Sequence, residues 1–239
     1  MEKNITNWHN CLSDPDNAYL QTNWQGQKPF VALCLKLGEP GLWVDLGCGI
    51  SYFVECCQRY GIECEGLEGD DYAVELARKR YPAISVKQYD ITDNLPYDDR
   101  SVSVVFCNQV LEHLPSEKTV PFLREVRRIL KQGGLFFVNM PSTYNKEQKK
   151  EKKHINLMSP SELNGHLLGA GFNDIWPANY PRFIFGKSFI GKALAGVLFF
   201  LFPFDRFCSN ASAICFVDEH IRGRVRGYRY FHLRRLFGW

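Results

Sequence analysis

The sequence predicts an α/β protein with a doubly wound, mostly parallel sheet that is covered by helices on both faces. Short apolar runs rich in β-branched and aromatic residues alternate with amphipathic stretches over residues 42–139. Apolar runs of this kind, separated by helices, are typical of parallel strands buried on both faces. A glycine-containing turn follows the first run, at the place where open α/β sheets bind ligands.

Strands and helices alternate along the chain. Apolar runs bounded by turn residues predict strands at 42–46, 62–67, 84–88, 102–107 and 133–139. The amphipathic stretches between them predict helices at 51–60, 71–80 and 118–130. A helix is also expected within 159–172, because Ser159 suits an N-cap, Pro160 the first turn and Glu162 a capping box. A late strand is expected over 211–219.

These elements divide the chain into five parts. We expect an N-terminal helical cap (1–40), a ligand-binding core (41–182), a hydrophobic insertion (183–210), the last core strand (211–220) and a basic, aromatic tail (221–239). The length of 239 residues fits one large domain or one domain with an appendage.

Composition narrows the class of protein. Apolar residues make up 45% of the chain and charged residues 23%, which is typical of globular proteins. The net charge of +3 is too small to predict a partner. Nine cysteines without a CxxC pair favour a reduced, intracellular protein over a zinc or disulfide framework. No apolar run resembling a signal peptide occurs at the N-terminus, and no spacing indicates a metal site.

Three successive strand ends carry residues suited to a nucleoside. Gly47 and Gly49 follow the first strand, Glu68 ends the second and Asp90 follows the third. Glycines let a ligand approach the backbone, and the next helix offers free N–H groups. A carboxylate about 20 residues beyond the glycines can accept hydrogen bonds from ribose hydroxyls. Asp90 would then face the amino edge of adenine. The alternative for the glycines alone is an ordinary tight turn.

The glycine turn departs from the dinucleotide pattern. Tyr52 stands where G-x-G-x-x-G has its third glycine, and a bulky residue there would obstruct close packing of helix and strand. The Walker pattern is also absent. An adenosine compound without a pyrophosphate is therefore expected, and a nicotinamide oxidoreductase is disfavoured.

Four stretches together resemble the class I S-adenosylmethionine-dependent methyltransferases. They are "VDLGCGISYF", "GLEGDDYAVELARKR", "QYDITDNLPYDDRSVSVVFCNQVLEHL" and "FLREVRRILKQGGLFFVNMPS". The resemblance covers roughly residues 40–180, and "HINLMSPSELNGHLLGAGF" resembles the segment leading to the sixth strand. It implies a Rossmann-like sheet of seven strands, the last of them antiparallel. It also implies S-adenosylmethionine as cofactor and S-adenosylhomocysteine as its product.

The resemblance also implies residue roles. The methionine end of the cofactor would be held by Asp45, Gly47, Cys48 and Gly49, with Asn108 nearby. Glu68 and Gly69 would bind the ribose, and Asp90 with the backbone of Ile91 the adenine. Ser51 stands where the family often has a further glycine, and Glu68 replaces the commoner aspartate; neither change is expected to abolish binding.

Transfer to an oxygen usually needs a base in addition to positioning. His113 and His154 are the catalytic candidates, since both follow predicted strand ends, and Glu112 is a weaker one. The alternative for a lone histidine is a structural role. The lysine-rich stretch 142–154 is expected to be a solvated loop, with a lid over the site as the alternative.

The last third of the chain holds two unusual segments. The apolar stretch 183–204 has an uncharged part of only twelve residues, whereas a membrane-spanning helix needs about 20. The tail 221–239 mixes arginines with aromatic residues. Such a mixture fits an anionic membrane surface, an ordinary packed tail or, less well, RNA.

We therefore expect a methyltransferase that methylates an oxygen of a glycan, a lipid-linked intermediate or another small molecule. An RNA-modifying methyltransferase and a non-catalytic membrane-associated scaffold are the alternatives. The expected location is the cytoplasm, peripheral at the inner face of a membrane, and nucleic acid is not the expected partner. The oligomeric state is left open.

Overall fold

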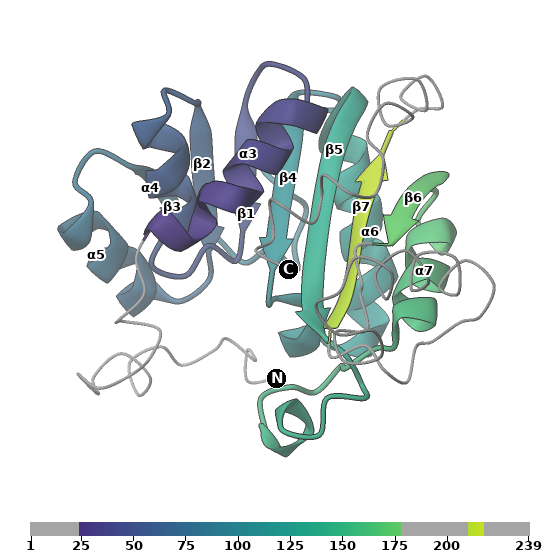
Figure 1. Cartoon of the computed structure of the whole chain (residues 1–239). Coiled ribbons are helices and arrows are strands. Elements are labelled where there is room, and N and C mark those ends of the chain that lie inside the picture. The colour runs from purple at the N-terminus through teal and green to yellow at the C-terminus, as the bar shows by residue number, and fades with distance from the viewer. Residues whose placement is uncertain (1–23, 178–209, 218–239) are drawn as a thin grey trace, which may run out of the picture.

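The computed structural model describes residues 24–177 and 210–217, and within them a single seven-stranded sheet dominates (Figure 1). The strand order is β3-β2-β1-β4-β5-β7-β6. The neighbours from β3 to β5 pair in parallel, whereas β7 pairs antiparallel with both β5 and β6. The strands are β1 Trp43–Leu46, β2 Cys64–Glu68, β3 Ser85–Gln88, β4 Val102–Asn108, β5 Leu130–Pro141, β6 Asp174–Pro177 and β7 Asn210–Phe216. The predicted fold class, with its antiparallel last strand, is confirmed.

Helices cover both faces of the sheet, and each face has its own apolar core. In Figure 1, α3, α4 and α5 lie on one side, and α6 and α7 on the other. The helical elements are η1 Trp24–Gln27, α3 Lys28–Leu37, α4 Tyr52–Arg59, α5 Asp71–Arg80, η2 Leu111–His113, α6 Ser116–Ile129, η3 Gln148–Lys150 and α7 Pro160–Gly169. The strand order reverses between β1 and β4, so the carboxyl ends of these two strands flank the position where such sheets bind ligands.

Most predicted elements are present with ends shifted by one to three residues. The capping box of α7 is confirmed: Glu162 N–H donates to Ser159 Oγ at 3.2 Å, and Ser159 N–H donates to Glu162 Oε2 at 2.7 Å. One shift of three residues is at β5, which begins at Leu130 rather than at residue 133. Leu130 already pairs with Val102, before an irregularity in the pairing of β4 with β5. Strand pairing therefore begins ahead of the glycines that the sequence suggests as its boundary.

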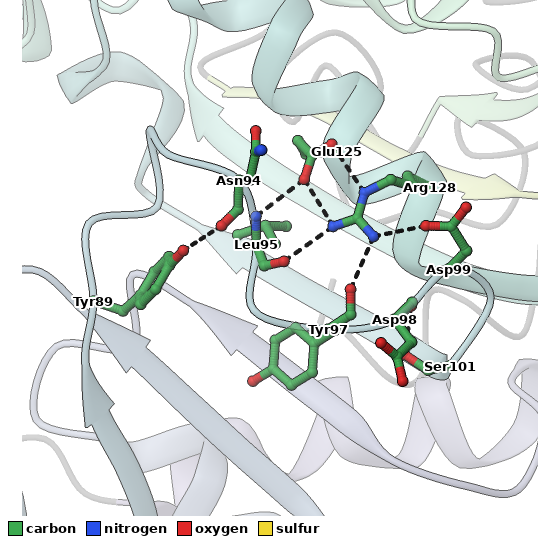
Figure 2. A network of polar contacts seen from close by, with 9 residues as sticks. All are labelled: Tyr89, Asn94, Leu95, Tyr97, Asp98, Asp99, Ser101, Glu125 and Arg128. Carbon is green, nitrogen blue, oxygen red and sulfur yellow. Dashed lines mark hydrogen bonds and ion pairs between the residues drawn. The ribbon is translucent and has the colours of Figure 1, made fainter.

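The connection from β3 to β4, residues 89–101, contains no helix and is instead held against α6 by one arginine (Figure 2). The Arg128 guanidinium donates to the carbonyls of Leu95 and Tyr97 and to the carboxylates of Asp99 and Glu125, at 2.8–3.0 Å. Glu125 in turn accepts the N–H of Leu95 at 3.0 Å. Leu95 itself is buried in the core. This network gives a fixed course to the loop that carries Asp90.

Among residues 24–177 and 210–217, no helix is long and apolar enough to cross a membrane. The expected hydrophobic insertion, up to residue 209, and the expected tail 221–239 lie outside the described residues. So do residues 1–23 of the expected cap, whose remainder forms η1 and α3.

Candidate functional site

The turn after β1 has a left-handed backbone at three positions. Gly47 and Gly49 have φ of 69° and 52°, and Ser51, the N-cap of α4, has φ of 64°. A Cβ atom on Gly47 would lie 2.6 Å from Cγ2 of Val110, which follows β4. Gly47 is therefore required both by its backbone conformation and by the segment packed on it. The same conformation at Ser51 explains physically why a glycine is common there in the family that the sequence resembles.

Glu68 ties this turn to the end of β2. Its Oε2 accepts the N–H of Gly49 at 2.8 Å, and its Oε1 accepts the N–H of Asp70 at 3.0 Å. Burial raises the pKa of Glu68, while these backbone amides lower it. A carboxylate has about four acceptor positions. Glu68 thus holds the glycine turn, and with the amides of Gly49, Asp70 and Gly69 bound it keeps one acceptor position for a ribose hydroxyl.

Asp45 and Cys48 lie within electrostatic reach of Glu68. Burial raises the pKa of Asp45, and the nearby Glu68 raises it further. Burial likewise raises the pKa of the Cys48 thiol, with added contributions from both carboxylates. Ser51 Oγ donates to Cys48 Sγ at 3.2 Å. The fold therefore gathers the four predicted residues of the methionine end, with Glu68, at one place.

Asp90 and Ile91 begin the loop held by Arg128. Asp90 Oδ1 accepts hydrogen bonds from the N–H and the Oγ1 of Thr92, at 3.1 and 2.8 Å. Ile91 is buried in the core beneath the loop. Of the predicted ribose residues, Glu68 ends the neighbouring strand β2 and Gly69 follows it. The predicted adenine residues therefore lie beside the predicted ribose residues, at the carboxyl edge of the sheet.

Asn108 belongs to a polar network that sequence reasoning missed. Asn139 Nδ2 donates to Asn108 Oδ1 at 2.6 Å, and Asn139 Oδ1 accepts from Asn210 Nδ2 and Ser212 Oγ at 3.1 and 2.6 Å. The network joins the ends of β4 and β5 to the antiparallel strand β7. In the sequence, the only sign of this network is Asn139, a polar residue near the end of an apolar run. Its partners can be recognised only once β5 is known to lie between β4 and β7.

Tyr52 is buried, and its side chain packs against residues of α5. It lies with Ile50 in a small cluster beside α5, and its ring meets that of Tyr81 edge to face at 6.4 Å. At the position where the sequence predicts obstructed packing of helix and strand, the structure shows an aromatic contact between the start of α4 and the end of α5.

Glu112, His113 and His154 come together at the same edge. Glu112 and His113 belong to η2 after β4, and His154 to the long connection after β5. One ligand atom from each of the three lies within 4.8 Å of the other two, and the two imidazole rings are 5.0 Å apart. His113 Nδ1 is 3.1 Å from the carbonyl oxygen of Lys153, and His154 Nδ1 is 3.1 Å from that of Gln148. The predicted catalytic candidates are therefore neighbours.

The electrostatics of this cluster come from burial. Glu112 is fully buried, and neither of its carboxylate oxygens has a hydrogen-bond partner among the described residues. Burial raises the pKa of Glu112 to about 8 and lowers the pKa of His113. The imidazole of His113 is consequently held in its neutral form. The sequence shows no metal-ligand spacing, whereas the fold brings three groups of metal-binding type together.

The lysine-rich connection after β5 lies at this edge of the sheet. It contains η3 and returns to the core where Ser142 bridges Met158. Asn156 anchors it to η2, since its N–H donates to the Glu112 carbonyl at 3.1 Å and its Nδ2 to Thr119 Oγ1 at 2.9 Å. In Figure 1 this connection extends beyond the arrowhead of β5. The stretch is thus a solvated loop that also contributes a side chain to the cluster.

The fold, the left-handed glycine turn and the acidic strand ends together define a class I methyltransferase domain. Residues 44–138 match the family model of the methyltransferase domain. This part of the chain is similar to that domain, and S-adenosylmethionine is the cofactor of the class.

The relatives agree with this class. A probable S-adenosylmethionine-dependent methyltransferase of Mycobacterium tuberculosis is 31% identical over 55% of this chain and 48% of its own length. A trans-aconitate 2-methyltransferase of Rhizobium rhizogenes is 28% identical over 57% of this chain and 60% of its own. A ubiquinone biosynthesis O-methyltransferase of Alkalilimnicola ehrlichii is 24% identical over 71% and 69%. The chain therefore spans about half the length of the first of these relatives.

Solved structures share the fold. A methyltransferase from Archaeoglobus fulgidus superposes with a TM-score of 0.63 at 16% identity, covering 83% of this chain and 96% of its own. A phosphoethanolamine N-methyltransferase of Haemonchus contortus, solved with S-adenosylhomocysteine, gives 0.61 at 15% identity over 81% and 53%.

The residues at the edge fit this cofactor. The left-handed turn at Gly47 and Gly49 lies beside the buried Glu68, whose Oε2 accepts the N–H of Gly49. The binding roles of individual residues remain predictions.

Proposed function

We propose that this protein transfers a methyl group from S-adenosylmethionine to an oxygen of a glycan, a lipid-linked intermediate or another small molecule. One observation carries the proposal: the glycine turn and the Glu112–His113–His154 cluster are adjacent. Val110 packs on Gly47, and Glu112 follows Val110 by two residues. A cofactor cradle and a group of proton acceptors thus share one edge of the sheet.

The names of two relatives support a small acceptor. One is a trans-aconitate 2-methyltransferase and the other an O-methyltransferase of ubiquinone biosynthesis. The second name also supports oxygen as the receiving atom.

The chain's own residues have separable tasks in this reaction. S-adenosylmethionine supplies an electrophilic methyl group on its sulfonium and leaves as the neutral thioether S-adenosylhomocysteine. Gly47 and Gly49 let the backbone approach the cofactor, and Glu68 orients the ribose. When the acceptor oxygen takes the methyl group from the sulfonium, its hydroxyl proton would pass to the cluster. The Nε2 atoms of His113 and His154 are suited to this, because each Nδ1 faces a carbonyl oxygen.

The test is calorimetric titration with S-adenosylhomocysteine, with NADH as the control ligand. Saturable binding of S-adenosylhomocysteine alone is expected. Glu68→Ala should weaken it by about tenfold or more, because a hydrogen bond to a charged group contributes roughly 1.5–3 kcal/mol. Glu63→Ala, an exposed glutamate just before the same strand, is the matched control and should bind as the parent does.

Each outcome of this titration has a consequence. Unchanged affinity in Glu68→Ala would make the ribose assignment wrong. If the folded protein binds no S-adenosylhomocysteine, the enzyme proposal fails and a non-catalytic scaffold explains the fold better. After binding, a screen of hydroxyl acceptors with radiolabelled S-adenosylmethionine identifies the substrate class.

A further inference from the structure

The Glu112–His113–His154 cluster has the features of a metal site as well as those of a proton acceptor. Its three groups come from two connections that Asn156 links, so their positions do not depend on one flexible loop. His113 and His154 are half-buried, while Glu112 is fully buried. The cluster is therefore closed to solvent at Glu112 and partly open to solvent at the two histidines.

Both histidines are set in the tautomer that metal ligands need. A ring nitrogen that lies 3.1 Å from a carbonyl oxygen must carry the proton and donate it, as Nδ1 does in His113 and in His154. Nε2 then carries the lone pair on each ring. Metal-binding histidines almost always donate their other N–H to a carbonyl or carboxylate in this way. Two neighbouring histidines that share this arrangement point to a common ligand.

The carboxylate supplies a second, independent observation. Glu112 is 0% exposed, and both of its oxygens lack a hydrogen-bond partner among the described residues. A buried carboxyl group without a partner is costly, and buried charges are normally paired or coordinate a metal. Within the cluster, the unprotonated Nε2 atoms of the two imidazoles are acceptors, so they cannot donate to the ionised carboxylate that a metal would need. A cation bound among the three residues, one ligand atom of each lying within 4.8 Å of the other two, would satisfy the carboxylate, and Nε2 is the ring atom of each histidine that is free to bind it.

We propose that Glu112, His113 and His154 bind one divalent transition-metal ion of the Zn²⁺ type. Two imidazoles and one carboxylate form a ligand set used by catalytic zinc sites, which keep further positions for water or substrate. Imidazole favours transition metals over Mg²⁺ and Ca²⁺, which prefer oxygen ligands. Ligands about 2.1 Å from a tetrahedral ion lie roughly 3.4 Å apart, so donor atoms that are now within 4.8 Å of one another must approach by up to about 1.4 Å through side-chain rotation.

The charges around the cluster are mixed. Lys153 lowers the pKa of His113 and Glu151 raises it, so these two side chains act in opposite directions on a bound cation. The net attraction for a metal must therefore come from the three ligands themselves, and above all from Glu112.

Only the catalytic consequence of this site rests on the proposed function. An acceptor hydroxyl on an open position of the metal would become more acidic and lose its proton to water at a lower pH. The two histidines would then hold the metal rather than take the proton. Cation binding itself requires neither a cofactor nor an acceptor.

The test is titration of the whole protein with Co²⁺, followed by visible absorption. One equivalent should bind in a saturable manner, with the weak bands of nitrogen and oxygen ligation, and Zn²⁺ should displace it while Mg²⁺ should not. Glu112→Gln and His154→Ala should each weaken Co²⁺ binding by about tenfold or more. His166→Ala, a partly exposed histidine on α7, is the matched control and should bind as the parent does.

Several outcomes would overturn the site. The first is a failure of Co²⁺ to bind in a saturable manner, and the second is an unchanged Co²⁺ affinity in both Glu112→Gln and His154→Ala. The third is intense thiolate-to-cobalt absorption, which would place the metal on cysteines. Circular dichroism and S-adenosylhomocysteine titration of each variant separate this from misfolding. Metal binding without S-adenosylhomocysteine binding would refute the enzyme proposal alone, and the converse would refute the metal site alone.

Discussion

At the scale of single residues, the glycine turn combines a backbone requirement with a steric one. Gly47 and Gly61 have nearly equal φ values of 69° and 70°, but their surroundings differ. A Cβ on Gly47 would lie 2.6 Å from Val110, whereas a Cβ on Gly61 would meet nothing within 4 Å. The substitution Gly61→Ala therefore measures the free-energy cost of the left-handed backbone alone, about 1–2 kcal/mol for a residue with a Cβ.

Gly47→Ala should therefore destabilise the protein more than Gly61→Ala does. Adding Val110→Ala removes the clashing methyl groups, so the double variant should be more stable than the sum of the single effects predicts, by about 1 kcal/mol. Urea unfolding of the four variants measures this coupling. Strict additivity would show that Val110 does not constrain the turn.

Residue identity alone left the roles of Glu112, His113 and His154 open. Each has a structural alternative in the sequence, and nothing in the spacing of His113 and His154 marks them as partners. The long connection after β5 decides their proximity, because it returns to η2 through Asn156. By contrast, the positions of Glu68 and Asp90 at this edge were predictable, since each adjoins a strand end and the ends of parallel strands share an edge.

At the scale of elements, the connection from β3 to β4 contains no helix, and contacts with α6 hold the loop 89–101 in place. Arg128 donates to two loop carbonyls and two carboxylates (Figure 2). Its hydrogen bonds, with that from the Leu95 N–H, lower the pKa of Glu125. The ionised form of Glu125 is therefore the one that holds the loop.

Stability should consequently fall in acid through this network. The unfolded pKa of glutamate is about 4.3 and the folded pKa of Glu125 is lower, so the unfolded state binds more protons between them. The contribution is complete above the unfolded value and is lost as the pH falls through the folded value. Glu125→Gln should lose less stability than the parent between about pH 5 and pH 3.

Denaturant midpoints across this range measure the difference. Glu117→Gln, an exposed change on the same helix, is the control and should follow the parent. Parallel curves for Glu125→Gln and the parent would contradict the role of the carboxylate.

At the scale of the whole molecule, the sheet order places five separate connections at one edge. Residues near positions 47, 68, 90, 112 and 154 converge there because β1, β2, β3, β4 and β5 are parallel. The segments 183–204 and 221–239 add to this core, in our proposal, a surface that binds anionic membranes. Its support is the sequence: an apolar stretch and a tail that mixes arginines with aromatic residues.

Deletion of 221–239 should therefore reduce sedimentation with vesicles of phosphatidylserine and phosphatidylcholine, and salt should weaken binding of the full chain. S-adenosylhomocysteine affinity, measured in parallel, controls for the fold. Undiminished sedimentation of the shortened chain would show that the tail is not the anchor.

The sequence by itself determined the order and type of the main elements and the edge that carries the residues predicted to bind the cofactor. Periodicity, caps and glycine turns are local, and parallel pairing brings successive strand ends together without further information. Only the tertiary structure decided that His113 and His154 meet over a buried Glu112, that Asn139 joins three strands and that Arg128 holds the loop of Asp90. These contacts join residues about 30 to 70 positions apart. Their formation depends on the path of connections between strands, which no local pattern specifies.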